Sequence, residues 1–188
     1  YCNGQLVSLA SRYDDFLNEG VRIVAIDVDS PAQHAAMIEK LDLPFPYLSD
    51  PDRSKAIRPY DVVDEQDARN IARPAMILID TAGEERFRFV SRDFADRYPE
   101  DRVLEVADSL GLARTTAEPM NSGSAEPGPS AMPFEGLWFY LRGARFAALA
   151  MGLRHKDLGE SIKEDSKAYV ETMDRMLEAI KEYTKRRS

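Results

Sequence analysis

The sequence holds one cysteine, two histidines and one tryptophan in 188 residues, and these scarcities exclude several classes of protein. The single cysteine, Cys2, excludes an internal disulfide framework and fits a reducing compartment, although it does not by itself separate the cytoplasm from export. We expect a cytoplasmic protein. His34 and His155 are far apart and lack the neighbouring ligands of a metal centre, so no metal is expected. No glycine-rich phosphate loop is present, which argues against a nucleotide or flavin cofactor. No uncharged apolar stretch is long enough to span a bilayer.

The charges are unevenly distributed along the chain. The 33 acidic and 25 basic residues give a net charge of −8, which argues against non-specific nucleic-acid binding. Residues 1–133 hold 14 Lys and Arg against 24 Asp and Glu (−10), whereas residues 134–188 hold 11 against 9 (+2). Residues 113–136 are rich in Pro, Ser, Gly and Thr, which is typical of a flexible linker. We therefore predict a domain over 1–112, a linker over 113–136 and a helical hairpin over 137–188.

Apolar periodicity in the first part alternates between helical and extended segments. It predicts, in chain order, a helix over 5–18, a strand covered on both faces over 21–28, a helix over 31–41, a short edge strand over 44–50, a helical turn over 54–60, strands over 75–80 and 85–90, and a helix over 99–110. This order gives an α/β domain with a mixed sheet flanked by helices, a three-layer thioredoxin-like fold without its opening strand. Because the chain begins without methionine, we expect that strand upstream of Tyr1.

The last part reads as two amphipathic helices, over 134–155 and 157–185, that form a hairpin. Three roles are open for this hairpin. It packs on its own domain or forms a homodimer with a second copy; it lies on a membrane surface through Trp138, Phe139, Tyr140 and the neighbouring arginines; or it docks onto a reductant protein. The first role is the expected one.

Cys2 stands where the first helix begins. The unsatisfied N–H groups and the dipole of a helix N-terminus favour an anion, so its thiol is a candidate nucleophile. The alternative is a small buried apolar side chain, since unpaired cysteines are among the most buried residues.

Four segments resemble one family of thiol enzymes, in order along roughly residues 1–112. They are Cys2-Asn3-Gly4-Gln5-Leu6, the stretch from Gly20 to Pro31, Leu43-Pro44-Phe45-Pro46-Tyr47-Leu48-Ser49-Asp50-Pro51-Asp52, and the stretch from Ala72 to Asp80. Together they are similar to the alkyl hydroperoxide reductase and thiol-specific antioxidant family, the peroxiredoxins and redoxins. The resemblance implies a thiol-dependent antioxidant enzyme that reduces hydroperoxides through Cys2, with a thioredoxin-like protein or a small thiol as reductant. Thiol–disulfide exchange on proteins and a catalytically silent scaffold that binds partners remain alternatives.

Tyr1-Cys2-Asn3 also resembles the end of a two-cysteine motif whose first cysteine would precede Tyr1. In that case Cys2 would be the resolving thiol.

The resemblance also implies roles for Arg73 and Pro74. The family places an arginine six residues before the aspartate that closes this strand, whereas Arg73 lies seven residues before Asp80 and Pro74 takes the arginine position. Arg73 is therefore either the cation beside the thiol or a solvated charge at the end of a strand. Pro74 is expected to be the cis-proline that redoxins place opposite the active cysteine. Four aspartates at strand ends and turns are expected to accept backbone hydrogen bonds instead of holding a metal: Asp27, Asp29, Asp50 and Asp52.

Overall fold

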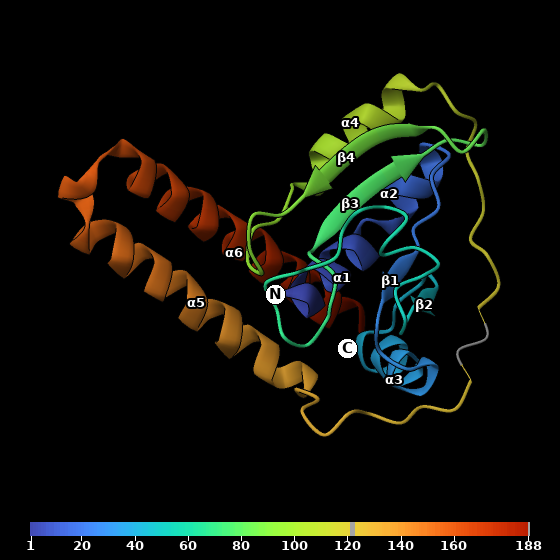
Figure 1. The fold of residues 1–188 in the computed structure, drawn as a ribbon, viewed down its shortest axis with the longest axis horizontal. Helices are drawn as coiled ribbons and strands as arrows, with labels where there is room; N and C mark the ends of the chain where they lie inside the picture. The colour runs from blue at the N-terminus through green and yellow to red at the C-terminus, as the bar shows by residue number, and fades with distance from the viewer. Residues whose placement is uncertain (121–122, 188) are drawn as a thin grey trace. The chain divides into compact units, whose positions relative to one another are not determined.

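The computed structural model describes residues 1–120 and 123–187 (Figure 1), which divide into two compact units. One unit joins Tyr1–Ser11 to Met132–Ser188, and the other is Arg12–Ala131. The second unit contains α2 (Tyr13–Asn18), β1 (Ala25–Asp27), α3 (Pro31–Leu41), β2 (Tyr47–Ser49), β3 (Ala75–Ile79), β4 (Glu85–Val90) and α4 (Glu100–Ser109). The predicted order of helices and strands is confirmed apart from the helical turn expected over 54–60, and β1 and β2 are shorter than expected.

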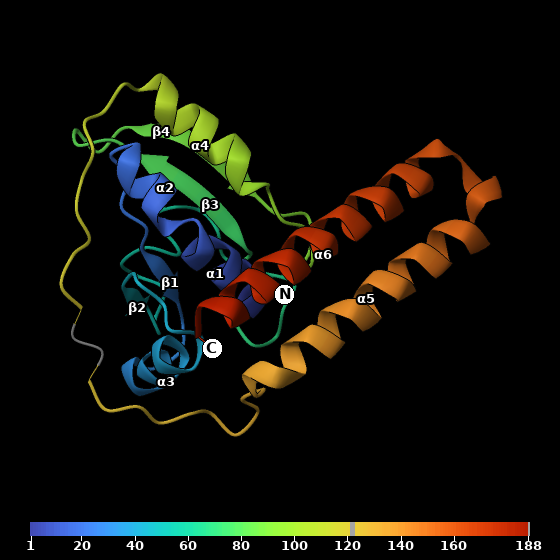
Figure 2. The ribbon, with the colours of Figure 1, turned by 180° about the vertical axis from the view of Figure 1, so that it is seen from behind.

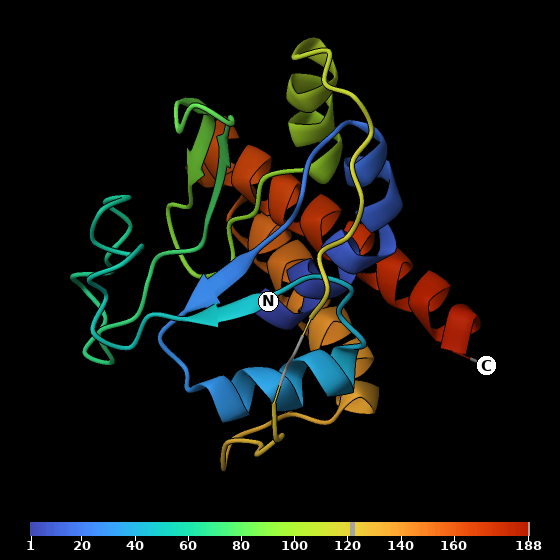
Figure 3. The ribbon, with the colours of Figure 1, turned by 90° about the vertical axis from the view of Figure 1, so that its right-hand side faces the viewer.

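Parallel and antiparallel strand pairs both occur in this unit, which confirms the α/β class. β1 and β2 are parallel, with Ala25 opposite Tyr47, and lie side by side above α3 in Figure 3. β3 and β4 form an antiparallel hairpin in which Ala75 faces Val90. Over the described residues these are two separate two-stranded sheets and not the single mixed sheet that we expected. Each pair is joined locally, the first through α3 and the second through a tight turn, and no ladder connects them.

Three segments differ from their predicted form. The helix expected over 5–18 ends at Ser11 and restarts at Tyr13, because Arg12 leaves the helical conformation (φ −107°, ψ 8°). The strand expected over 21–28 is limited to β1, since the N–H of Val21 still bonds back to the carbonyl of Phe16 (2.8 Å). Val24 and Ile26 are 48% and 39% exposed, so this strand is not covered on both faces, as we had expected. The segment 54–60 forms turns and no helix.

Helix α3 shows how the sequence sets its own boundaries. The Ser30 hydroxyl accepts a hydrogen bond from the N–H of Gln33 (3.3 Å), and the Gln33 side chain accepts one from the N–H of Ser30 (2.9 Å). This capping box, with Pro31 in the first turn, fixes the start of the helix. Asp42 ends it in the left-handed conformation (φ 48°). The chain that follows delivers Phe45 into the core, where it is fully buried.

The other unit packs α1 (Cys2–Ser11) with α5 (Phe134–Arg154) and α6 (Glu160–Arg187), the last two joined by a short 3₁₀ turn (Lys156–Leu158). Figure 2 shows α1 beside α6. The core of this unit is apolar and fully buried at Val7, Leu141 and Met173. Gly4 permits the close approach, because a Cβ there would lie 2.8 Å from the Met176 sulfur.

The predicted C-terminal helices are confirmed, but the grouping of α1 with them was not foreseen. The first of them begins at Phe134, within the range that we read as linker. Among the described residues no helix combines the length and apolar character needed to cross a membrane.

Candidate functional site

The thiol of Cys2 lies at the first residue of α1, is exposed to solvent and takes part in no disulfide. The helix starts here because the carbonyl of Tyr1 accepts the N–H of Gln5 (3.0 Å). The early N–H groups of α1 therefore lie around Cys2, where a helix favours negative charge. The exposed position excludes the buried, inert role that was the alternative for this residue.

Tyr1, which directly precedes α1, lies beside one tyrosine from α5 and one from α6. The ring of Tyr1 stands edge-on to the rings of Tyr140 on α5 and Tyr169 on α6, with centroids 5.5 and 5.9 Å away. The Tyr169 hydroxyl donates a hydrogen bond to the Tyr1 hydroxyl. Burial raises the pKa of Tyr140, and the neighbouring Tyr1 and the charge of Cys2 raise it further. We call Tyr1, Tyr140 and Tyr169 the tyrosine cluster.

Sequence reasoning missed this cluster. It named Tyr140 only in the alternative membrane-surface role of the hairpin, and it placed Tyr169 on an amphipathic stripe, because each tyrosine fits the pattern of its own helix. No local spacing connects residues 1, 140 and 169, and only the packing of α1 against the hairpin brings them together.

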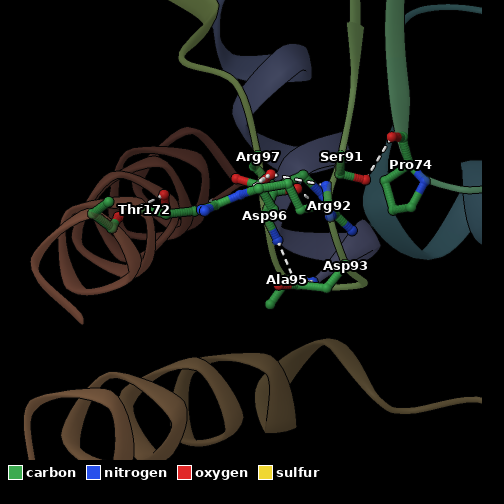
Figure 4. A network of polar contacts seen from close by, with 9 residues as sticks. Pro74, Ser91, Arg92, Asp93, Ala95, Asp96, Arg97 and Thr172 are labelled. Atoms are coloured by element: carbon green, nitrogen blue, oxygen red, sulfur yellow. Dashed lines mark hydrogen bonds and ion pairs between the residues drawn. The ribbon is translucent and has the colours of Figure 1, made fainter. Parts of the chain in front are cut away.

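Arg73 and Pro74 lie in the other unit, directly before β3. The N–H of Arg73 donates to the carbonyl of Val62 (2.8 Å), which fixes the backbone ahead of the strand. The carbonyl of Pro74 accepts two hydrogen bonds from Ser91, one from its N–H (2.9 Å) and one from its hydroxyl (2.6 Å), and Figure 4 shows the second of them. Ser91 is 1% exposed, so these two hydrogen bonds are buried.

The expected cis bond at Pro74 is wrong, since the described residues contain no cis peptide bond. The trans form is the ordinary state of a peptide before proline. Here it lets the extended chain pass directly from the bond between Arg73 and Val62 into the pairing of Ala75 with Val90.

The loop after β4 carries a buried arginine that sequence reasoning also missed. Arg97 is 6% exposed and donates through Nη1 to the carbonyl of Asp96 (2.7 Å). The loop is shaped by Asp93, whose carboxylate accepts the N–H of Ala95 (2.7 Å), and by Asp96, which accepts the N–H of Arg92 (3.0 Å) (Figure 4). In the sequence, Arg97 stands among aspartates and reads as one more solvated charge. Its burial makes it a second candidate cation, in the same unit as Arg73.

The predicted site residues therefore divide between the units. Arg73 and Pro74 are neighbours on one strand entrance, and Cys2 belongs to the unit that contains the hairpin. Three of the four aspartates have the expected structural role. Asp50 accepts the N–H groups of Lys55, Ala56 and Ile57 (2.9–3.1 Å), Asp52 accepts that of Ser54 (3.1 Å), and Asp27 accepts that of Asp29 (2.8 Å).

One group in the described chain has the composition of a metal site: the ligand atoms of Asp27, Asp29 and His34 lie within 4.8 Å of one another. The donor set does not fit a metal, however. Asp27 already accepts hydrogen bonds from the His34 ring (2.6 Å), the Tyr47 hydroxyl and a backbone N–H. Burial acts to raise the pKa of Asp27, but these bonds outweigh it and lower the pKa. A metal-bound histidine ordinarily donates through its second nitrogen, and the buried Nδ1 of His34 has no partner.

Comparison with known proteins connects the first half of the chain to one family. Residues 1–87 match the family model described as AhpC/TSA family. The chain is 33% identical over 92 residues to "Peroxiredoxin 2" of Sulfuracidifex metallicus, covering 46% of this chain and 42% of that protein. It is 30% identical over 76 residues to a "Peroxiredoxin" of Thermoplasma volcanium, covering 37% of each. The chain thus spans less than half the length of either curated relative.

A solved structure supports the same assignment of fold. The structure titled "Mycobacterium tuberculosis AhpC" aligns with a TM-score of 0.51 and 25% identity, over 59% of this chain and 62% of that one. The family match includes Cys2, Arg73 and Pro74, whereas α5 and α6 lie outside it.

Proposed function

Because the chain is a member of the peroxiredoxin and redoxin family, we propose that it is a thiol peroxidase that reduces hydroperoxides through Cys2. The observation that carries this proposal is the exposed thiol at the start of α1, inside the matched segment. The thiolate, not the thiol, is the nucleophile, and a helix N-terminus favours the charged form. A hydroperoxide is the substrate class that this chemistry accepts.

The reaction divides into an oxidation and a reduction. The Cys2 thiolate attacks one peroxide oxygen; a sulfur–oxygen bond forms, the oxygen–oxygen bond breaks, and the leaving oxygen takes a proton to give an alcohol or water. Sulfur has lost two electrons and is a sulfenic acid. A reductant thiol then forms a disulfide with Cys2 and releases water, and a second thiol frees Cys2. We propose a small thiol or a thioredoxin-like protein as the source of these reducing thiols, in a reducing compartment such as the cytoplasm.

We assign supporting roles to two sets of residues. We propose that the tyrosine cluster offers a hydroxyl donor to the charged sulfur or to the leaving oxygen, because Tyr140 and Tyr169 lie against Tyr1, the residue directly before Cys2. Arg73 is assigned as the cation that stabilises the thiolate. Pro74 is assigned as the residue that sets the course of the backbone between Arg73 and β3. These assignments rest on the position of the two residues in the matched segment.

The test is hydroperoxide consumption by the full chain with a dithiol reductant, compared between the unmodified protein and Cys2→Ser. Serine retains size and polarity but is a far weaker nucleophile, so we expect the rate to fall at least about a hundredfold. Ser11→Ala, at the other end of α1, is the matched control and should retain the rate.

Three results would contradict the proposal. Peroxide consumption that survives Cys2→Ser removes Cys2 as the attacking group. An unmodified protein that reduces a protein disulfide but consumes no peroxide indicates the thiol–disulfide oxidoreductase, and activity in neither assay indicates the scaffold.

A further inference from the structure

Helix α5 has two apolar faces, and only one of them is packed against other residues that the structure describes. Leu137 and Leu141 are buried in the unit formed with α1 and α6. On the same side, Gly152 is required by packing, because a Cβ there would lie 2.2 Å from the Ser166 hydroxyl. The Ser166 hydroxyl also donates to the carbonyl of Ala148 (2.8 Å). Close packing against α6 therefore accounts for the small residues on this inner face of α5.

The opposite face exposes large apolar side chains at a regular interval. Phe139, Phe146 and Leu153 are 73%, 52% and 65% exposed and follow one another every seven residues, which places them in one line along the helix. Between them lie Gly143 and Ala150, both exposed. We call these five residues the outer face of α5.

Gly143 has no explanation inside the described chain. Nothing lies within 4 Å of where its Cβ would be. A glycine inside a helix is less stable than alanine at the same position, so its occurrence there indicates a close neighbour from outside. With Phe139 and Phe146 on either side, it forms a hole between two knobs.

We propose that the outer face of α5 binds the same face of a second copy of this chain, with the two helices antiparallel and Phe146 close to the two-fold axis. Phe139 and Leu153 lie seven residues on either side of Phe146, so each meets the other across the axis. The small residues Gly143 and Ala150 let the two backbones approach. Self-complementarity of this kind is what a two-fold interface requires.

The charges and the area agree with this arrangement. Arg142 and Arg145 both stack on Phe146 (5.8 Å to the ring centre), and Asp174 balances the charge of Arg145 through an ion pair (2.5 Å). In the antiparallel pair the two copies of Arg142 lie on opposite sides of the axis, whereas a parallel pair would place them side by side. An aromatic side chain can bury roughly 150–250 Å², so Phe139 and Phe146 leave on the order of 200–300 Å² of apolar surface on each copy. With Leu153 and the flanking stems, two copies approach the roughly 1,000 Å² of a small specific interface. We therefore expect a reversible, concentration-dependent dimer.

A lipid surface fits this face less well. Helices that lie on membranes pair one apolar face with one polar face, whereas α5 is apolar on both sides. Lipid chains also adapt to the surface of a helix, so binding to a membrane does not require a residue without a side chain at Gly143.

The test is molar mass by light scattering or sedimentation over a dilution series of the full chain in the Cys2→Ser background, which removes disulfide formation and is independent of peroxidase activity. We expect a monomer–dimer equilibrium that Phe146→Asp shifts to the monomer by about tenfold or more in concentration. Phe94→Asp, an equally drastic change at a residue 68% exposed in the other unit, is the matched control and should leave the equilibrium unchanged. Circular dichroism checks that each variant is folded.

Orientation is tested by cysteine cross-linking in the same background. In the antiparallel dimer, a mixture of Phe139→Cys and Leu153→Cys chains forms the mixed disulfide, and Phe139→Cys alone does not cross-link. A chain that stays monomeric throughout, a dimer unaffected by Phe146→Asp, or a monomer that binds anionic vesicles through Phe146 would each overturn the proposal.

Discussion

The ring of Tyr1 stands edge-on against the ring of Tyr140, with centroids 5.5 Å apart and planes inclined at 69°. Tyr1 directly precedes Cys2, and Tyr140 belongs to α5, which lies outside the segment that matches the family. The surroundings of the thiol are therefore built partly by the C-terminal hairpin. The hairpin has a role at the thiol that is separate from the outer face of α5.

Removal of the Tyr140 hydroxyl should slow the reaction of the Cys2 thiol. The proposed role of this hydroxyl is to donate a hydrogen bond to the thiolate. Since a net hydrogen bond is worth about 0.5–1.5 kcal/mol, that role predicts that Tyr140→Phe lowers the alkylation rate of Cys2 by iodoacetamide at neutral pH by about two- to tenfold. Tyr60→Phe, in the other unit, is the matched control. An unchanged rate in Tyr140→Phe would remove this hydroxyl from the site.

The proximity of Cys2 and Tyr140 also predicts that Cys2 affects the pKa of Tyr140. The charge of Cys2 raises the pKa of Tyr140, because a neighbouring anion disfavours a second negative charge. Cys2→Ser removes that charge and should therefore lower the pKa of Tyr140. Carbon-13 labelled tyrosine followed by NMR through alkaline pH measures the shift, and Tyr140→Phe assigns the signal. A Tyr140 titration identical in both proteins would show that Cys2 exerts no charge on it.

Asp50 should couple the stability of the second unit to pH. Burial acts to raise its pKa, but the backbone N–H groups of Ile57, Ala56 and Lys55 outweigh burial and lower the pKa. A carboxylate with a lowered pKa contributes stability above its unfolded pKa and loses it as the pH falls through the folded value. Asp50→Ala should therefore lower the melting temperature by roughly 5–10 °C at neutral pH, with the difference shrinking in acid. Asp52→Ala, on an exposed neighbour, should cost far less.

The fold could be predicted largely from local patterns, and the site only in part. The helix boundaries of α3 follow from Ser30, Pro31 and Gln33, which act on their own backbone, so a single sequence suffices. β1 could not be bounded in this way, because a strand ends where its partner ends, and Tyr47 to Ser49 supply only three partners. The tyrosine cluster and the burial of Arg97 depend on packing between segments distant in sequence.

Helix packing at Gly4 gives a stability prediction for the unit that holds Cys2. A Cβ at this position would lie 2.8 Å from the Met176 sulfur and 3.1 Å from Leu141. The end of a methionine side chain can shift, so Gly4→Ala should be tolerated. Gly4→Val adds two further carbons against the fully buried Leu141 and should lower the free energy of unfolding by about 1–3 kcal/mol. Urea unfolding at fixed pH measures both variants, and equal stability of the two would contradict the packing of α1 described above.

The two hydrogen bonds from Ser91 to Pro74 predict how much the backbone directly before β3 contributes to the free energy of unfolding. Ser91 donates to the Pro74 carbonyl through both its N–H and its hydroxyl, and it is almost fully buried. Ser91→Ala removes only the second bond, since the N–H remains, and should cost about 1 kcal/mol of unfolding free energy. Ser91→Val also lacks the hydroxyl donor but adds one further methyl group to this buried site, and it serves as the comparison. If the entrance to β3 also positions Arg73 for the thiol, both variants should lower peroxide consumption more than they lower stability, and retention of full activity in both would separate these hydrogen bonds from the reaction.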